Sequence, residues 1–469
     1  MAQIPADFTE QLCAIVGQDK VLTDTGECWS YGYDNSRKHH PPQAVVFARD
    51  HDEVQAIVRL CHRRLVPLVA RGRGSNTAGG TVPVAGGLVL SLERMSDILH
   101  VDPDNRVMHV QPGVTNAAVQ AAAKEHNLFW PPDPSSSGFC TVGGNLGMNA
   151  AGPRAVKYGG TREHVLGLRA VTGEGEDIHT GVYTTKGVVG YDLTRLLIGS
   201  EGTLAVITEA LLKLTPLPET VVTVQAQYAS IHDAAEAVTR IMRLPLTPCA
   251  LEFMDAAAID LVREFNPSLG NEEIGAMLMI EMDGPASAME AAVDALRTTA
   301  GPGGLLQFTV ARTEEEVREL WAMRKALSPA LRKRAPNKLN EDVVVPVTRI
   351  PALIKGLERL SREYGIPIVN FGHAGNGNIH VNLLYDTQDE RQAQNARPCV
   401  RKVFELVLDL GGTLSGEHGI GREKRDYVGM EIEKPVLDLM WGIKQRFDPR
   451  GILNPGKVFP PEYRYSGTD

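Results

Sequence analysis

The feature that most constrains the fold of this 469-residue chain is a strand–helix–strand pattern that runs directly into a glycine-rich segment. Residues 43–49 (QAVVFAR) and 66–70 (VPLVA) have the short apolar pattern of strands, and the apolar residues between Val54 and Cys61 recur at helical spacing. Together they predict a βαβ unit. The next residues, RGRGSNTAGG at 71–80, are small enough for backbone N–H groups to face an anion. Alone, such a turn is only weakly specific for a ligand.

The remaining pattern predicts an α+β chain rather than a simple doubly wound sheet. Strands are expected at 87–92, 98–102 and 106–111, followed by a helix at 115–126. After the proline-containing boundary segment TPLPET, the order of strands and helices is typical of a ferredoxin-like α+β domain. Its expected elements are strands at 220–228, 274–283 and 306–311 and helices at 232–243, 286–299 and 313–328.

Two further small-residue segments accompany the first glycine-rich loop. One is PPDPSSSGFCTVGGNLGMNAAG at 131–152, and long irregular stretches of this kind in compact chains are usually functional. The other is IGSEGTL at 198–204. The chain has neither GxxxxGK[ST] nor a convincing GxGxxG that opens a helix, which argues against P-loop and Rossmann nucleotide sites. Three loops could instead surround a long diphosphate ligand.

Charge and cysteine content exclude several classes of protein. The chain has 48 Lys+Arg against 57 Asp+Glu, a net charge of −9, and no cationic block, so a nucleic-acid groove is not expected. Its six cysteines form no CxxC pair, which indicates reduced thiols in the cytoplasm. A signal-peptide pattern and an apolar run of about 18 residues are both missing, so no transmembrane segment is expected. Peripheral attachment to a membrane and a homodimer remain open.

The strongest signal for chemistry is the segment His373-Ala-Gly-Asn-Gly-Asn-Ile-His380. Asn-Gly is the preferred dipeptide of a two-residue type I′ turn, so we expect a hairpin in which His373 faces His380. Directly opposed residues have Cβ atoms about 5 Å apart, from which two imidazoles can reach one metal ion. Asn382 then lies on the same face. The alternative is that the two histidines only fill or cap a hairpin.

A second glycine-bracketed segment, Ser-Gly-Glu417-His418-Gly, favours the metal interpretation. Adding Glu417 gives two histidines and a carboxylate, a ligand set suited to zinc or another divalent transition metal such as manganese or iron, with a position left for substrate. His418 then remains for proton abstraction from an alcohol, since a neutral imidazole is suited to that role near pH 7. His418 could instead be a fourth ligand.

Taken together, these motifs resemble the FAD-linked oxidases of the vanillyl-alcohol oxidase/p-cresol methylhydroxylase (PCMH) superfamily. Five separated motifs carry the resemblance in order, and within the superfamily they are similar to D-2-hydroxyacid dehydrogenases such as D-lactate dehydrogenase, the glycolate oxidase flavoprotein subunit and D-2-hydroxyglutarate dehydrogenase. The motifs are RGRGSNTAGG, the 131–152 segment, GSEGTLAVITE, NFGHAGNGNIHVN with SGEHGIGREK, and ILNPGK. The resemblance implies a PCMH-type FAD-binding domain at 1–217, a substrate- and metal-binding domain at 218–424, and a segment at 425–469 that returns to the FAD domain.

The resemblance also implies which residues bind FAD. The histidine that carries FAD covalently in some relatives is replaced here by Ser75, so the FAD is expected to be non-covalent. Cys140 lies where certain other relatives form a second bond, although a buried cysteine is usually a small apolar filler. The implied FAD-binding residues are Arg71, Gly72, Arg73, Gly74, Ser75, Asn76, Thr77, Pro132, Asp133, Ser135, Cys140, Thr141, Gly143, Gly144, Asn145, Asn149, Gly152, Glu201, Gly202, Ile207 and Asn454.

For the substrate, the resemblance places Arg324 on a carboxylate, a role to which the two-pronged guanidinium is well matched. Sequence alone would favour an exposed helix arginine there. Lys338 is expected to assist it, and Asn382 completes the expected substrate-binding set. The resemblance assigns metal binding to His373, His380 and Glu417, the same three residues that their types and spacing indicate. His418 is expected to be the catalytic base.

The expected activity is FAD-dependent oxidation of a D-2-hydroxy acid, with D-lactate favoured, to the 2-oxo acid. Hydride would pass to flavin N5, and electrons would leave to a quinone, a cytochrome or an electron-transfer flavoprotein. Glycolate and D-2-hydroxyglutarate are alternative substrates, and a flavin subunit active only in a complex is an alternative organisation. A metallohydrolase using the His/His/Glu site is the alternative from another enzyme class.

Overall fold

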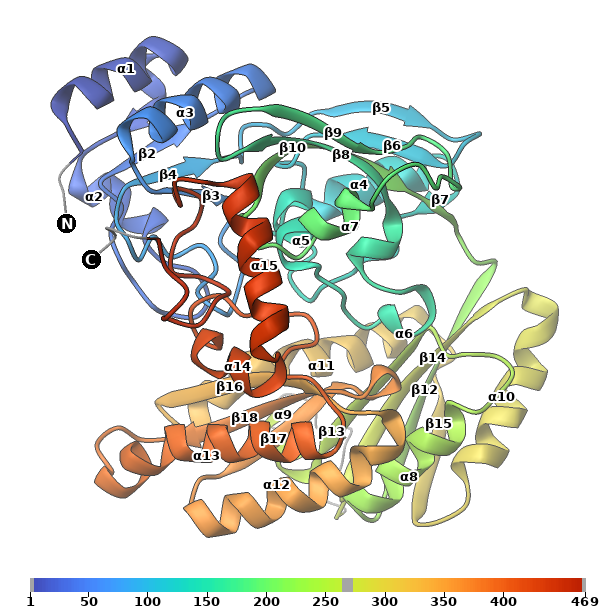
Figure 1. Cartoon of the computed structure of the whole chain (residues 1–469). Helices are drawn as coiled ribbons and strands as arrows, with labels where there is room; N and C mark the ends of the chain where they lie inside the picture. Colours follow the sequence, from blue (N-terminus) through green and yellow to red (C-terminus); the bar gives the residue numbers. More distant parts are fainter. Residues whose placement is uncertain (1–3, 264–272, 466–469) are drawn as a thin grey trace. The chain divides into compact units, whose positions relative to one another are not determined.

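The structure is a computed structural model that describes residues 4–263 and 273–465 (Figure 1). Its chain forms two compact units. Unit 1 comprises residues Met1–Ala151, Gly159–Leu217 and Glu417–Asp469, and unit 2 comprises Gly152–Tyr158 and Pro218–Gly416. Both units contain helices and strands, which confirms the expected α+β class. In the described ranges, no helix is both long and apolar enough to cross a membrane.

Unit 1 begins with a four-stranded sheet of order β1-β2-β4-β3, in which β2, β4 and β3 run parallel. Helix α3 begins after Asp50, whose carboxylate accepts a hydrogen bond from the backbone N–H of Glu53. The helix packs its apolar face against α1 and the sheet. The elements are α1 (Ala6–Val16), β1 (Val21–Leu22), α2 (Thr25–Cys28), β2 (Ala44–Phe47), α3 (His51–Arg64), β3 (Leu68–Arg71) and β4 (Leu88–Ser91).

A second sheet of unit 1 has five antiparallel strands in the order β5-β6-β10-β8-β9. Its core includes the fully buried Trp130, whose indole N–H donates to the carbonyl of His164 at 3.1 Å. The elements are β5 (Ile98–Asp102), β6 (Val107–Val110), α4 (Asn116–Lys124), β7 (Leu128–Phe129), α5 (Val142–Met148), β8 (Val165–Thr172), β9 (Asp177–Gly181), α7 (Leu193–Leu197), β10 (Ala205–Lys213) and β11 (Thr215–Pro216).

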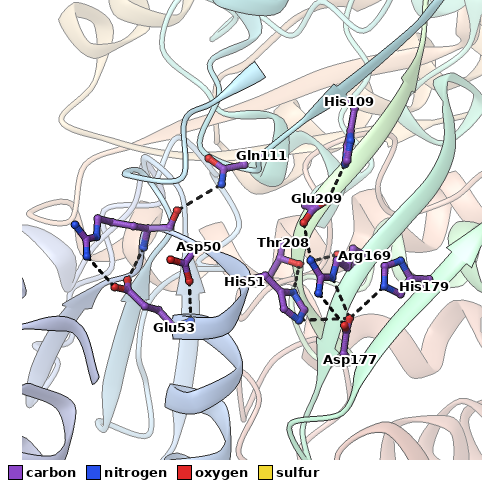
Figure 2. A network of polar contacts seen from close by, with 11 residues as sticks. Asp50, His51, Glu53, His109, Gln111, Arg169, Asp177, His179, Thr208 and Glu209 are labelled. Atoms are coloured by element: carbon purple, nitrogen blue, oxygen red, sulfur yellow. Dashed lines mark hydrogen bonds and ion pairs between the residues drawn. The ribbon is translucent and has the colours of Figure 1, made fainter. Parts of the chain in front are cut away.

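A polar network joins helix α3 to the five-stranded sheet within unit 1 (Figure 2). His51, the first residue of α3, lies with Nδ1 2.9 Å from Thr208 Oγ1 and Nε2 3.4 Å from Asp177. Arg169 continues the network by donating to Asp177 at 2.9 Å and to Glu209 at 3.0 Å. Burial lowers the pKa of His51, so the neutral imidazole is the favoured form.

The C-terminal segment of unit 1 returns to its first sheet. Leu453 forms a parallel bridge with Leu68, and α14 (Val428–Glu431) and α15 (Lys434–Phe447) precede it. Residues 417–424 are expected from sequence in the domain at 218–424, but their contacts place them in unit 1. The reason is local, because the backbone N–H groups of Gly421 and Arg422 donate to Glu201 and to the carbonyl of Ala78.

Unit 2 is built on a seven-stranded sheet of order β15-β12-β14-β13-β17-β18-β16. Each pair of neighbouring strands in this sheet is antiparallel. The strands are β12 (Thr220–Tyr228), β13 (Ala250–Asp255), β14 (Ala276–Gly284), β15 (Leu305–Val310), β16 (Asn337–Val344), β17 (Ile368–His373) and β18 (Asn378–Tyr385). The helices are α6 (Ala155–Tyr158), α8 (Ile231–Ile241), α9 (Ala256–Arg263), α10 (Ala286–Ala300), α11 (Glu314–Arg334), α12 (Ile350–Tyr364) and α13 (Glu390–Asp409).

Helices cover the two faces of this sheet unequally. On one face, α8, α10, α12 and α13 contact the strands (Figure 1). On the other, α9 and α11 form a core with alternate strand residues such as Met254, Met277 and Phe371. Because side chains alternate along a strand, Glu252 and His373 lie on this second face as well. The polar residues described next therefore lie beside the α11 core.

Candidate active site

The histidine hairpin forms, but its turn differs from the expected one. Residues 374–376 make one turn of 3₁₀ helix, and Gly377 follows in the left-handed region with φ 75°. Glycine is required there, because a Cβ would lie 1.8 Å from the carbonyl oxygen of Val345. His373 therefore pairs with Asn378, and the prediction that His373 directly faces His380 is wrong.

The two histidines nevertheless share one face of the sheet. His380 pairs with Phe371, so the observed register differs from the expected one by two residues, and a shift of two leaves every side chain on its original face. The imidazole centroids lie 5.2 Å apart and the rings are nearly perpendicular. Both side chains are buried.

Glu417 joins these histidines. One ligand atom from each of His373, His380 and Glu417 lies within 4.8 Å of the others, and they are the one group of this kind found in the described part of the chain. Asp342, on β16 directly opposite His380, fixes the approach of the segment. Its carboxylate accepts from Ser415 Oγ at 3.1 Å and from the Gly416 N–H at 3.0 Å. Two imidazoles and a carboxylate at this spacing fit a divalent transition metal.

Glu252 connects the histidine to the predicted substrate arginine. This carboxylate is fully buried on β13; one oxygen lies 2.6 Å from Nδ1 of His373, and the other accepts from Nε of Arg324 at 2.6 Å. Burial alone would raise the pKa of Glu252, but the positive charges and hydrogen bonds of His373 and Arg324 bring it below its ordinary value. The carboxylate is therefore ionised.

Arg324 itself is buried, contrary to the exposed position that the sequence alone would favour. It lies on α11, whose Met323 and Leu327 pack into the core beneath the sheet. The guanidinium carbon lies 4.9 Å from the centre of the Phe371 ring, in a cation–π arrangement. An arginine tolerates this burial because Glu252 compensates its charge.

The other two predicted substrate residues lie on neighbouring strands of the same face. Asn382 is fully buried; its Nδ2 donates to the carbonyls of Val369 and His380, each at 3.1 Å, and its Oδ1 accepts from Asn340 at 2.5 Å. Lys338 is partly exposed, with Nζ 3.3 Å from Ser328 Oγ on α11. Asn382 therefore has protein partners on both ends of its amide, whereas Lys338 is closer to solvent.

In unit 1, the three small-residue loops converge. Asn454 donates from Nδ2 to the carbonyl of Gly80 at 2.9 Å and to that of Glu201 at 2.7 Å. The Glu201 N–H donates in turn to the carbonyl of Gly147, which lies within the second of these segments, 131–152. Lys457 donates to the carbonyl of Val82 and to Asn454, and burial lowers the pKa of Lys457 to about 7. Segments far apart in sequence thus form one cradle.

Two observations indicate that this cradle fits FAD. Asn145 is only 2% exposed, yet its Nδ2 has no oxygen or nitrogen acceptor in the described part of the chain, so a ligand oxygen would satisfy it. At Gly202, which has φ 69°, no atom lies within 4 Å of where a Cβ would stand. At Gly72, by contrast, a Cβ would be 2.3 Å from Thr141 Oγ1, so the first two loops can approach one another only with glycine there.

Several of the predicted FAD residues are engaged with the protein itself. Arg71 donates to the carbonyl of Tyr33 and to Thr81, and it lies beneath Gly74, where a Cβ would meet its guanidinium. Asn149 ends α5 in the left-handed region, with φ 51°. The carbonyl of Pro132 accepts a hydrogen bond from Asn116, and the N–H of Asp133 donates to the carbonyl of Ala151. Gly143 lies close to Pro112, and Ile207 belongs to the apolar core.

The remaining predicted FAD residues differ in exposure. Cys140 is 2% exposed, and burial raises the pKa of its thiol. Gly144 donates to the Thr141 side chain that caps α5. Gly152, at φ 100°, is the first residue of the short stretch assigned to unit 2. Half-buried positions are Gly72, Gly74, Ser75 and Thr77. Ser135 is exposed, and Arg73 is exposed beside the ring of Phe139.

The segment that carries His418 is fixed to the same cradle. Asn76 donates from Nδ2 to the carbonyl of His418 at 3.0 Å, while its Oδ1 accepts from the N–H groups of Ala78 and Gly80. Glu201 accepts from the N–H groups of Ile420 and Gly421 at 2.7 and 2.8 Å. Two residues that were predicted only as FAD contacts therefore also position the backbone on either side of His418.

Sequence reasoning missed Glu252 and Asp342. Both are fully buried carboxylates on strands of unit 2, and each contacts the predicted metal-binding segments. A charged residue inside an otherwise apolar strand was the available signal, as in the run Ala-Leu-Glu252-Phe-Met. Buried carboxylates need partners, so such a position should be examined for a nearby cation or metal ligand.

Comparison with solved structures identifies the class of fold. The chain superposes on p-cresol methylhydroxylase with substrate bound with a TM-score of 0.78 at 16% identity, covering 98% of each chain. Residues 42–181 match the FAD binding domain, and residues 217–458 match the C-terminal domain of FAD linked oxidases. The chain thus has the fold of p-cresol methylhydroxylase and contains an FAD binding domain. More particularly, it belongs to the family of FAD-linked oxidases, which confirms the resemblance seen in its motifs, and it is an FAD-dependent oxidoreductase.

Sequence relatives cover nearly the whole chain. Glycolate oxidase subunit GlcD of Bacillus subtilis is 38% identical over 98% of this chain and 98% of its own length. D-lactate dehydrogenase of Anaerostipes hadrus is 35% identical over 89% of each chain. D-2-hydroxyglutarate dehydrogenase of Stutzerimonas stutzeri is 34% identical over 96% of this chain and 98% of its own. Each of the three names contains a 2-hydroxy acid.

Proposed function

We propose that this protein oxidises a D-2-hydroxy acid to the 2-oxo acid, with D-lactate as the favoured substrate. The three relatives named above support a 2-hydroxy acid, since glycolate, D-lactate and D-2-hydroxyglutarate all have a CH–OH group next to a carboxylate. The reaction removes two electrons and two protons from this carbon and its oxygen. The electrons would then leave to a quinone, a cytochrome or an electron-transfer flavoprotein.

In this proposal, FAD when bound supplies the acceptor for the α-hydrogen and its electron pair. The FAD-binding residues are those from Arg71 to Thr77, those of the 131–152 segment, and Glu201, Gly202, Ile207 and Asn454. Arg324 binds the substrate carboxylate through its terminal nitrogens, with Lys338 and Asn382 as further polar contacts. His418 takes the hydroxyl proton on a neutral imidazole nitrogen.

His373, His380 and Glu417 would bind a divalent cation, with zinc favoured over manganese or iron. Such a cation, when bound, lowers the pKa of a coordinated hydroxyl. The observation that carries the proposal is the position of Glu252 between His373 and Arg324. One buried carboxylate contacts both the predicted metal ligand and the predicted carboxylate-binding residue, as expected if the two act on one small substrate.

A second organisation has some support. The relative from Bacillus subtilis is named as a subunit, so this chain could be active only with partner chains. A metallohydrolase, the candidate from another class, is disfavoured because the chain belongs to a flavoprotein family. Activity of the purified single chain separates the first alternative from the main proposal.

The test is anaerobic bleaching of the flavin absorbance by a panel of D- and L-2-hydroxy acids, followed by turnover with an artificial acceptor. We expect D-lactate to bleach the flavin fastest, and D isomers to bleach it faster than L isomers. Bleaching without turnover by the single chain would support the subunit organisation. A protein whose flavin no 2-hydroxy acid reduces would contradict the proposed function.

A further inference from the structure

The carboxylate of Glu252 lies at the centre of the polar face of unit 2. Its strand, β13, pairs on one side with β14 and on the other with β17, where Glu252 is the registered partner of His373. The residue is fully buried. Both of its oxygens are engaged, one with His373 and one with Arg324, each at 2.6 Å. A buried carboxylate with two such partners is fully constrained.

We propose that Glu252 is a positioning residue that selects the metal-binding nitrogen of His373 and the substrate-binding edge of Arg324. This inference rests on the proposed function, because it concerns the same cation and the same substrate carboxylate. It assigns Glu252 no contact with either of them. Its action passes entirely through the two side chains that it contacts.

The first part follows from the chemistry of the two groups. An ionised carboxylate only accepts hydrogen bonds, so the His373 nitrogen beside it, Nδ1, must carry the proton. An imidazole that binds a metal must be neutral, so its lone pair then lies on Nε2, the nitrogen available to a cation. Histidine ligands of metals usually donate their other N–H to a carboxylate or carbonyl, and loss of that partner typically lowers metal affinity 10–100-fold.

The second part follows from the geometry of Arg324. Its Nε–H is used by Glu252, and its guanidinium is stacked over the Phe371 ring at 4.9 Å. The plane and one edge of the guanidinium are therefore fixed by the protein. The edge formed by the two terminal nitrogens remains for a bidentate contact with a carboxylate. Without Glu252, the side chain would lose this orientation and its compensating charge.

Glu281 provides a matched control. It lies on the adjacent strand β14, opposite Ala250, and is 4% exposed. Its Oε1 accepts from Thr223 Oγ1 at 3.0 Å and from Trp321 Nε1 at 2.7 Å. Neither partner belongs to the predicted metal or substrate residues. Glu252→Gln and Glu281→Gln therefore each remove one buried negative charge from the same sheet, but only the first touches His373 and Arg324.

The experiment measures zinc affinity of the flavin-loaded full chain, without substrate, by competition with a chromogenic chelator. We expect Glu252→Gln to weaken zinc binding 10–100-fold and to raise KM for the 2-hydroxy acid at least 10-fold. Glu281→Gln should change both by less than about 3-fold, and Glu252→Asp, which keeps the charge, should recover part of the loss. Flavin content and thermal unfolding check that each variant is folded.

Three results would overturn the inference. They are a folded Glu252→Gln protein that binds zinc as the wild type does, an equal loss in Glu281→Gln, and a wild type that binds no divalent cation. The last would refute the metal part of the proposed function too, whereas the first two leave it intact. If Glu252→Gln does not fold, ¹⁵N-histidine NMR of the metal-free wild type decides, with His373→Asn for assignment. The Nδ1–H tautomer is expected, and Nε2–H would contradict the inference.

Discussion

Glu201 accepts hydrogen bonds from the backbone N–H of Gly421 through both of its carboxylate oxygens, at 3.1 and 2.8 Å. The two residues are separated by more than 200 positions in the chain, yet this contact determines where the segment after His418 lies. Glu201 is buried, and its own backbone is in the left-handed region at φ 55°. A non-glycine residue in that conformation is uncommon, which indicates that its side chain is needed there.

Glu201→Gln should therefore slow flavin reduction while FAD remains bound. The glutamine has one acceptor oxygen, and its amide N–H₂ would face the donor N–H groups of Ile420 and Gly421. We expect a loss of about 1–3 kcal/mol in the free energy of unfolding from the unsatisfied groups. Anaerobic stopped-flow reduction and flavin content are the measurements. Loss of FAD with an unchanged reduction rate would instead support the role of Glu201 as an adenine contact.

Asn76→Asp is a companion variant that tests the other side of the His418 segment. Aspartate keeps the oxygen that accepts from Ala78 and Gly80 but has no N–H to donate to the carbonyl of His418. We expect slower flavin reduction with the loop itself intact, as judged by unchanged near-ultraviolet circular dichroism. Asn76→Ala, which removes both functions, should reduce stability in addition. Equal behaviour of the two variants would show that the donor contact has no role.

Glu417 and His418 should have separable effects. Glu417→Ala should lose the divalent cation and activity together, because Glu417 is one of three candidate ligands. His418→Ala should keep cation and FAD but reduce the flavin about 10²–10⁴-fold more slowly, the usual contribution of a positioned base. Metal analysis beside single-turnover reduction distinguishes the roles. A metal-free His418→Ala protein would show that His418 is a ligand rather than the base.

Flavin attachment is testable without substitution. Ser75 stands in the first loop where a histidine would be needed for a covalent link, and Cys140 is buried. Acid precipitation should therefore release the flavin into the supernatant. A yellow pellet would contradict this expectation, and Cys140→Ser would then show whether the thiol forms the bond.

Asp255 should make the stability of the protein depend on pH. It is fully buried and accepts from the N–H of Ala258 and from two nitrogens of Asn370, yet burial raises its pKa from 3.8 to about 6. Between these values the folded protein binds more protons than the unfolded chain, so the free energy of unfolding falls as pH rises through this window. Asp255→Asn lacks this dependence.

The stability advantage of the wild type over Asp255→Asn should therefore shrink by about 1 kcal/mol between pH 5 and pH 7. Urea unfolding of both proteins at pH 5, 6 and 7 measures it, with circular dichroism as the signal. An advantage that stays constant across this range would mean that Asp255 is ionised throughout.

The strands and helices that follow a regular pattern were predictable from local sequence. Residues 220–228 form β12 as expected, because alternating apolar residues pack on one face of the sheet. The hairpin register was not predictable, since Asn376-Gly377 favours a two-residue turn locally, whereas Gly377 is required by its approach to Val345. The close approach to Val345, which is distant in sequence, outweighed the local preference of the turn.

The candidate site was predictable in its residue types but not in its connections. Histidines between glycines are visible in sequence, and family motifs indicated Arg324. The contact of Glu252 with both His373 and Arg324 arises from strand order, in which β13 lies beside β17 although more than 100 residues separate them. The exposure of Arg324 was misjudged for the same reason, because its partner is distant in sequence.

The division of the chain into discontinuous units has a consequence during its synthesis. Buried hydrogen bonds inside unit 1 are made by Lys444, Asp448 and Asn454. These residues are translated only after all of unit 2. At about 5–20 residues per second, β3 emerges tens of seconds before Leu453 can bridge its edge. A nascent chain therefore carries an unpaired strand edge until Leu453 has been made, and ribosomes that stop before this residue would release a protein prone to aggregation.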